Sequence, residues 1–261
     1  MKRIEPRIIY SGREDFMATS AGNGLAGQRV VILGGSSGIG LAVAQQVVAQ
    51  GARAVIVSSN RERVAQAAGS IGENAEGFAV DLTDEPSIQS FFSKLGPFDH
   101  LVFTAGDTLH LNELATADLS QARRAFEIRY WGALAAVKYG SPGIRAGGSI
   151  VLTTGIANLR PQKGWAFGAS VCGAMEGLTR ALAVELAPIR VNTVSPGIVR
   201  TNLWQNMPES ERERMYEQRG KSLPVGRVGE AADIARAYLY FLQQGYSTGQ
   251  ILVVDGGGVL V

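Results

Sequence analysis

Short apolar runs alternate with segments of helical periodicity along most of the chain. Seven runs are continuous and rich in β-branched or aromatic residues, which indicates strands buried on both faces of a sheet. They lie at 29–33, 54–57, 78–80, 100–103, 149–153, 190–194 and 251–254, with helical stretches between them at about 41–50, 62–71, 86–94, 119–140, 166–187 and 230–243. Strand–helix alternation implies parallel pairing with right-handed crossovers. The pattern therefore predicts an α/β fold, a doubly wound parallel sheet in three α/β/α layers.

The same alternation predicts the domain organisation. No internal repeat or low-complexity tract interrupts it, so we expect a single domain over residues 27–261. The preceding residues, 1–26, are charged and then small and polar, and we interpret them as a flexible N-terminal tail. In a sheet of this kind, ligands bind beyond the carboxyl ends of the strands, where the strand order reverses.

The composition narrows the class of partner. Of the 261 residues, 46% are hydrophobic and 18% are charged, and the formal net charge is +2, which is ordinary for a soluble protein. No lysine- and arginine-rich block predicts binding to nucleic acid or to a membrane surface, and no apolar run of about 18 residues predicts a membrane span. Cys172 is the single cysteine and forms no metal-ligand cluster with His100 and His110. We therefore expect no metal, no internal disulfide and a cytoplasmic location.

A glycine-rich turn joins the first predicted strand to the first predicted helix. Glycines let the backbone turn tightly and approach a pyrophosphate, and the helix N-terminus then offers free N–H groups and the positive end of its dipole. In this strand–turn–helix context we interpret the turn as a dinucleotide-binding site. Its expected contacts are Gly34, Ser36, Ser37, Gly38, Ile39 and Gly40.

The spacing Gly34-x-x-x-Gly38-Ile39-Gly40 resembles the fingerprint of the short-chain dehydrogenase/reductase family. Further motifs follow in that family's order, namely Asp81-Leu82-Thr83, Thr104-Ala105-Gly106, residues 190–199, residues 223–227 and residues 254–257. The resemblance covers residues 27–261. It implies a Rossmann-type domain that binds a nicotinamide cofactor, catalyses hydride transfer and assembles as a homodimer or homotetramer. It also implies cofactor contacts at Asp81, Leu82, Ala105, Gly106, Pro196, Gly197 and Val199.

The end of the second predicted strand bears on the choice between NAD and NADP. An NAD enzyme usually places a carboxylate there, which accepts a hydrogen bond from the ribose 2′-hydroxyl. This chain has Ser58-Ser59-Asn60-Arg61, so no carboxylate repels a 2′-phosphate and several groups can donate to one. We predict NADP(H) in preference to NAD(H), with Ser59, Asn60 and Arg61 as contacts. The alternative for Arg61 is a solvated residue in the first turn of the helix.

The chain departs from the family at the catalytic residues. In the family, a tyrosine exchanges a proton with the substrate oxygen, a lysine one helical turn later lowers the pKa of that tyrosine, a serine orients the carbonyl and an asparagine supports a water relay. The resemblance places Phe167 and Val171 at the tyrosine and lysine positions. The serine position falls on Thr154, or on Gly155 if the register shifts by one residue, and the asparagine position falls on Arg129. Thr154 is then left to orient a carbonyl, and Arg129 either brings a positive charge to the site or pairs with a carboxylate on the helix surface.

Three classes of function remain open. The first, which we favour, is an NADP(H)-dependent reductase of a C=O, C=C or C=N group whose substrate needs no strong acid or takes its proton from another residue. The second is a cofactor-binding pseudoenzyme that acts through partners, and the third is a non-redox isomerase or cyclase on the same scaffold. The polar or reactive residues considered for catalysis are Lys163, Trp165, Arg129, Cys172 and His110.

A segment rich in large side chains is expected to cover the substrate. Residues 202–223 combine many charges with Leu203, Trp204, Met207, Met215 and Tyr216. This composition suits a substrate lid, an amphipathic helix packed on the domain, or both. Large apolar groups in a lid favour a small, largely apolar organic substrate. The apolar residues 257–261 favour burial against another copy of the chain.

Overall fold

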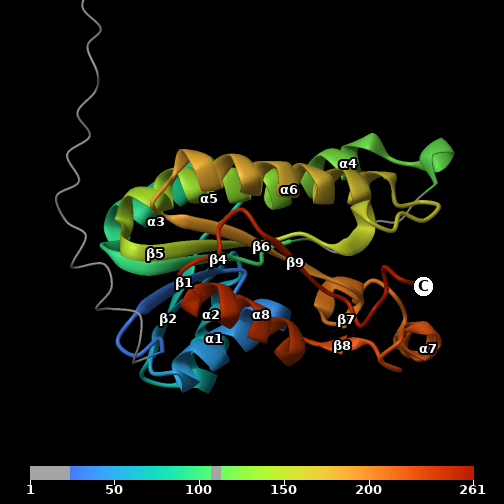
Figure 1. Cartoon of the computed structure of the whole chain (residues 1–261), viewed down its shortest axis with the longest axis horizontal. Coiled ribbons are helices and arrows are strands. Elements are labelled where there is room, and N and C mark those ends of the chain that lie inside the picture. Colours follow the sequence, from blue (N-terminus) through green and yellow to red (C-terminus); the bar gives the residue numbers. More distant parts are fainter. Residues whose placement is uncertain (1–23, 107–112) are drawn as a thin grey trace, which may run out of the picture.

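A computed structural model describes residues 24–106 and 113–261 of the chain (Figure 1). Within these ranges, seven parallel strands form one sheet in the order β3-β2-β1-β4-β5-β6-β9. The strands are β1 (Arg29–Leu33), β2 (Arg53–Ser58), β3 (Ala75–Ala79), β4 (Phe98–Phe103), β5 (Ile144–Thr153), β6 (Arg190–Pro196) and β9 (Ile251–Val254). A separate pair, β7 (Val199–Arg200) and β8 (Gly229–Glu230), lies beside the main sheet. The expected doubly wound fold is confirmed.

Helices cover both faces of the sheet. Figure 1 shows α1 (Gly38–Ala49), α2 (Arg61–Ile71) and α8 (Ala231–Gln243) on one face, and α3 (Glu85–Leu95), α5 (Ala133–Gly140) and α6 (Ala166–Glu185) on the other. The strand side chains alternate accordingly. Val30 and Ile32 pack towards α1 and α8, while Val31 and Leu33 pack towards α3 and α5. A central strand buried on both faces explains why β1 is apolar at every position after Arg29.

The remaining helices lie near one end of the sheet. The predicted helix over 119–140 is interrupted, because α4 (Leu119–Phe126) passes into a π-helical segment, η2 (Glu127–Gly132), before α5 begins. A Cβ atom on Gly132 would collide with the carbonyl oxygen of Leu82, so this close approach requires glycine. The other elements are α7 (Glu209–Ser222) and the 3₁₀ turns η1 (Leu114–Thr116), η3 (Ser141–Gly143), η4 (Ile156–Asn158) and η5 (Asn202–Trp204). No helix in the described ranges is long and apolar enough to cross a membrane.

The packed domain begins earlier than the sequence predicted. Leu25 is fully buried in the core under α1 and α8, and the N–H of Gly27 donates to the carbonyl of Gly51 at 2.9 Å. Residues 24–26 therefore belong to the domain, which corrects the tail boundary at residue 26. Burial of the Leu25 side chain contributes to holding this short segment on the domain. Residues 1–23 lie outside the described part of the chain.

A buried histidine links three strands at the end of the sheet that holds their N-termini. His100 on β4 lies with its Nδ1 2.8 Å from Ser149 Oγ and its Nε2 2.7 Å from Gln28 Oε1. Because Gln28 Oε1 only accepts, Nε2 carries the proton and Ser149 donates to Nδ1. Burial lowers the pKa of His100 from 6.5 to about 4, with a further lowering by the charge of Arg190. His100 is therefore neutral in the folded protein at physiological pH.

This histidine should make the fold sensitive to acid. Between about pH 6.5 and about pH 4 the unfolded chain binds a proton at His100 that the folded chain does not, so the free energy of unfolding should fall towards low pH, by up to about 1.4 kcal/mol per pH unit. Urea unfolding at about pH 7 and about pH 5 would measure this loss. His100→Gln keeps polar contacts without titrating, so its stability should change less over the same interval. An equal pH dependence in both proteins would contradict the assignment.

Candidate functional site

A large cavity lies at the carboxyl ends of the strands, at the reversal of strand order between β1 and β4. Its volume is about 590 Å³. Its walls come from segments far apart in sequence, which meet because parallel strands end at the same edge of the sheet. These segments are residues 34–40, 58–63, 81–82, 104–106, 128–129, 153–172, 196–205, 219–223 and 255–261. Every cofactor contact that the sequence predicted lines this cavity, except Asn60 and Arg61.

The glycine turn is built for a close backbone approach. Gly34 has φ +89°, and a Cβ there would lie 2.5 Å from the backbone N of Ala105. A Cβ on Gly40 would collide with the carbonyl oxygen of Gly34 and lie 2.5 Å from Thr104 Oγ1. Ser37 precedes α1 in an extended conformation, and its side chain does not cap the helix. The first N–H groups of α1 therefore face the cavity with no side-chain acceptor, as a pyrophosphate site requires.

The end of β2 shows a different arrangement from the one the sequence predicted. Ser58, Ser59 and Arg63 line the cavity, while Arg61 and Asn60 do not. The Asn60 side chain caps α2, since its Oδ1 accepts from the N–H of Arg63 at 2.8 Å. Arg63 lies two residues into the helix that this cap begins, and it takes the place expected for Arg61. The capping preference of asparagine before a helix was the signal that could have shown this.

The opposite end of the cavity has no acid or base of the kind the family uses. Its wall includes Thr154, Gly155, Gly168, Val171 and Cys172. Among the described residues that line the cavity there is no tyrosine, lysine or histidine. Of the sequence candidates for catalysis, Arg129, Trp165 and Cys172 face the cavity, whereas Lys163 pairs with Glu113 at 2.7 Å. His110 lies outside the described residues.

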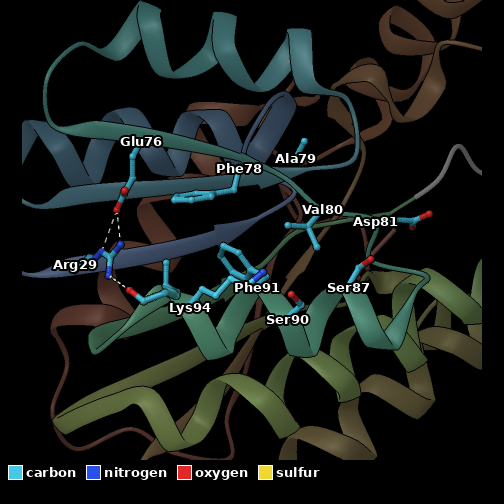
Figure 2. A pocket seen from close by; sticks show the side chains of 11 residues that line it. Arg29, Glu76, Phe78, Ala79, Val80, Asp81, Ser87, Ser90, Phe91 and Lys94 are labelled. Atoms are coloured by element: carbon cyan, nitrogen blue, oxygen red, sulfur yellow. Dashed lines mark hydrogen bonds and ion pairs between the residues drawn. The ribbon is translucent and has the colours of Figure 1, made fainter.

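A second hollow, of about 520 Å³, lies at the edge of the sheet between β3 and α3 (Figure 2). The Arg29 guanidinium donates to the Glu76 carboxylate at 2.5 Å and to the backbone carbonyl of Leu95 at 2.7 Å, and Figure 2 shows the Arg29 and Glu76 side chains facing each other. Phe78 packs edge-on against Phe91, with ring centroids 5.5 Å apart. The Arg29 charge is thus paired inside the fold, and its neighbouring side chains pack on one another. We therefore place the functional site in the first cavity, with which this hollow shares Asp81.

Comparison with known proteins identifies the family. A family described as enoyl-(acyl carrier protein) reductase matches residues 34–258. The 3-oxoacyl-[acyl-carrier-protein] reductase of Mus musculus is 36% identical over 199 residues, which are 73% of this chain and 80% of that protein. The short-chain dehydrogenase/reductase malC of Malbranchea aurantiaca is 32% identical over 189 residues, 69% of this chain and 72% of that protein. The chain belongs to the short-chain dehydrogenase/reductase family.

Solved structures of this family superpose over nearly the whole domain. A small-chain dehydrogenase in complex with NADPH has a TM-score of 0.80 at 37% identity and covers 90% of this chain and 100% of its own. The MalC reductase/Diels-Alderase from Malbranchea aurantiaca has a TM-score of 0.85 at 31% identity and covers 92% of this chain and 99% of its own. The chain is therefore an oxidoreductase-family protein with the complete dinucleotide-binding fold.

The lining of the cavity favours a register for the catalytic positions of this short-chain dehydrogenase/reductase that is one residue later than the sequence suggested. The family's tyrosine and lysine lie four residues apart on one helix face, so both must face the cavity. Gly168 and Cys172 have this separation and both line the cavity, whereas Phe167, the residue expected at the tyrosine position, does not. Gly155 lines it as well, and a Cβ there would lie 3.5 Å from Cys172 Sγ. Val171, the residue expected at the lysine position, lines the cavity as well, so the geometry speaks against Phe167 alone and favours Gly155, Gly168 and Cys172 as the serine, tyrosine and lysine positions.

Thr154 has a structural contact in place of the expected catalytic one. Its Oγ1 donates to the backbone carbonyl of Cys172 at 3.0 Å, and its N–H donates to Val194, which ties β5 to α6 and β6. Its hydroxyl proton is thus engaged within the protein. Burial raises the pKa of the Cys172 thiol, opposed in part by the Thr154 hydroxyl and the charge of Arg129. The thiol at the lysine position is therefore neutral at physiological pH.

Arg129 brings a positive charge to the cavity wall. It lies in the π-helical segment η2, an irregularity that re-aims side chains and is frequent at functional sites. Its guanidinium lies directly against Gly106. A Cβ atom on that residue would be only 2.6 Å from Arg129 Nη1. Glycine at position 106 thus makes room for the arginine as well as for a cofactor.

The segment expected as a lid borders the cavity and is also packed on the domain. Leu203, Trp204, Arg219 and Leu223 line the cavity. Trp204 is also buried with Tyr216 and Val228 in a small apolar cluster, and its Nε1 donates to the carbonyl of Val199 at 3.1 Å. Trp204 and Tyr216 therefore hold the segment on the domain, while Leu203, Leu223 and Arg219 line the cavity.

Proposed function

We propose that this short-chain dehydrogenase/reductase binds NADP(H) in preference to NAD(H). The support is the wall at the end of β2, where Ser58, Ser59 and Arg63 supply hydrogen-bond donors and a positive charge. Serine rather than a carboxylate directly follows the strand, and Glu62 in the first turn of α2 does not line the cavity. Asp81 lies nearby, and its Oδ1 accepts from the N–H and hydroxyl of Thr83 at 2.9 and 2.7 Å, so it is engaged in its own turn. The NADPH-bound family structure supports the same choice.

We further propose that the protein reduces a C=N or conjugated C=C group without a general acid of its own. The observation that carries this proposal is that the cavity wall has Gly168 and Cys172 four residues apart, and no tyrosine, lysine or histidine among its described residues. A bound NADPH would supply the hydride. A ketone must gain a proton as hydride arrives, whereas an iminium ion already carries the positive charge and a conjugated enone is protonated later, on carbon. The chain's own contribution is then to exclude water, orient the substrate against Trp165 and Leu203, and supply the fixed charge of Arg129.

The test combines nucleotide titration with a turnover screen. We expect NADPH to bind at least about tenfold more tightly than NADH, and Arg63→Ala to remove most of that difference, since a charge-assisted hydrogen bond is worth about 1.5–3 kcal/mol when well formed. Arg61→Ala is the matched control and should leave the preference intact. In the screen, a cyclic imine or an enone should be reduced and a simple ketone should not. Equal binding of both nucleotides, or ketones as the preferred substrates, would refute the proposal.

A second candidate is a non-redox cyclase. The similarity to the MalC reductase/Diels-Alderase favours it, together with a largely apolar cavity in which two catalytic side chains are replaced by glycine. Product formation without turnover of nucleotide would support this reading, and nucleotide binding with no product would favour a pseudoenzyme acting through partners.

We also propose that the protein is a cytoplasmic homodimer or homotetramer with a small, largely apolar substrate. Tyr246 is 98% exposed, and Val184 and Leu260 are 81% and 78% exposed, so apolar surface is available to a second copy. Size-exclusion chromatography with light scattering would measure the assembly.

A further inference from the structure

We infer that the substrate carries an anionic oxygen group, such as a carboxylate, and that Arg160 and Arg219 bind it at the mouth of the cavity. This inference rests on the proposed function, because it names the substrate class of the same cavity. The two arginines come from different elements. Arg160 follows η4, Arg219 is in the last turn of α7, and both line the cavity. Both residues are exposed, and the fold therefore brings two solvent-accessible positive charges to the lining of one cavity from segments 59 residues apart in sequence.

The Arg219 side chain is held by a neutral partner. Its Nη2 donates to Gln162 Oε1 at 2.9 Å, and Gln162 also lines the cavity. An amide acceptor orients the guanidinium without cancelling its charge. By contrast, Arg200 and Arg227 on nearby surface pair with Glu213 and Asp233, each at 2.6 Å. Arginine presents a planar fork of donors that suits a carboxylate, so an oriented and charged Arg219 is suited to bind one.

The charge at this wall is not neutralised within the described part of the chain. No carboxylate there lies within 4.0 Å of Arg160 or Arg219. Asp255 lines the same cavity, but its two oxygens accept from the N–H groups of Gly257 and Val259 at 2.9 and 2.8 Å. These hydrogen bonds hold the Asp255 carboxylate in its own turn, and it forms no ion pair with Arg160 or Arg219. The arginine pair is left to attract an anion from solution.

Large apolar side chains of the same cavity bear on the rest of the ligand. Trp165, Leu203 and Leu223 line it together with the two arginines. A ligand that satisfies both parts of the wall has an apolar body and an anionic end. Binding of the anionic end orients the apolar body of the ligand towards Gly168 and Cys172. This positioning compensates in part for the proton transfer that the missing catalytic groups would have provided.

The test compares an acid with its neutral isostere. Calorimetric titration of the NADP⁺-saturated protein with 4-phenylbutanoate and 4-phenylbutanamide, at low ionic strength, should show the acid binding about tenfold more tightly or better. Arg160→Gln/Arg219→Gln should bring the two affinities within about twofold of each other. Arg160→Lys/Arg219→Lys keeps both charges and should retain part of the preference. Arg214→Gln, an exposed residue of α7 outside the cavity wall, is the matched control and should leave the preference unchanged.

Two outcomes would overturn the inference. One is an acid that binds no more tightly than the amide, or not at all. The other is a preference for the acid that survives in the double glutamine variant. Nucleotide binding is measured first, so a failure of the proposed function is visible separately. If NADP⁺ does not bind, the same acid and amide titrations on the nucleotide-free protein still decide whether the two arginines recognise an anion.

Discussion

Replacing Gly155 by serine, Gly168 by tyrosine and Cys172 by lysine in one variant is expected to raise NADPH-dependent ketone reduction by about 100-fold or more over the natural chain. The magnitude follows from the contribution of a well-placed general acid, typically about 10²–10⁴-fold. The structure has room for the first side-chain atom at both glycine positions. A Cβ on Gly168 meets no heavy atom within 4 Å, and a Cβ on Gly155 makes only ordinary contacts, with Cys172 Sγ at 3.5 Å and Pro196 O at 3.8 Å. The backbone thus already holds the three positions at the cavity wall.

The matched control places the new tyrosine hydroxyl one residue earlier, at position 167 instead of 168. Gly155→Ser/Phe167→Tyr/Cys172→Lys carries the same new groups but places the tyrosine at position 167, which does not line the cavity. Steady-state kinetics with a ketone and NADPH should show activity in the first variant and no gain in the control. A gain in the control alone would return the tyrosine position to Phe167. No gain in either protein, with NADPH binding intact in both, would mean that Gly155, Gly168 and Cys172 are not the family's catalytic positions.

The fold could be predicted from sequence because its signals are redundant. Seven apolar runs predicted the seven strands of the sheet, because strands such as β1 and β2 are apolar and buried on both faces. The expectation of burial was wrong for β3, an edge strand with four of its five residues exposed, and β5 begins at Ile144, five residues before the predicted run. The helix predicted over 119–140 was less accurate. Its periodicity does not show that the backbone widens into a π-helical segment at Glu127–Gly132, where a close approach to Leu82 decides the local geometry. The burial of Leu25 was not predicted for a related reason. A single leucine in a polar segment gives no hydrophobic periodicity from which burial could be inferred.

The cofactor end of the site was predictable and the reaction end was not. Glycines 34, 38 and 40 are required by backbone geometry, so their spacing alone identifies the turn. At the reaction end, residues 165–179 contain no tyrosine or lysine that would mark the register. Phe167 and Val171 were assigned from the neighbouring sequence alone, and that does not fix the register to one residue. The possibility of Gly155 at the serine position was the useful signal, since the same one-residue shift moves the tyrosine position to Gly168 and the lysine position to Cys172.

The mutation Gly40→Ala is expected to lower the affinity for NADPH by about 100-fold or more and to destabilise the fold by about 1–3 kcal/mol. The added methyl group would collide with the carbonyl oxygen of Gly34 and lie 2.5 Å from Thr104 Oγ1. The Gly34 backbone is held in the turn, because its N–H donates to the carbonyl oxygen of Val57 at 2.8 Å. The atom that the new methyl group meets is therefore backbone and not the end of a flexible side chain that could move aside. The turn must open, and the N–H groups at the start of α1 then leave the position that suits a pyrophosphate.

Gly69→Ala is the matched control for this change. Gly69 is in α2, and a Cβ there meets nothing within 4 Å, so the same methyl group should stabilise the protein by up to about 1 kcal/mol through helix propensity and leave NADPH binding unchanged. Fluorescence titration with NADPH and urea unfolding on the two variants separate the effects. A Gly40→Ala protein that binds NADPH as tightly as the natural chain would show that the turn does not hold the pyrophosphate. A nucleotide would then have to bind elsewhere in the cavity. The proposals for hydride transfer and for the orientation of the substrate would both be wrong, because each requires a cofactor that lies between this turn and Cys172.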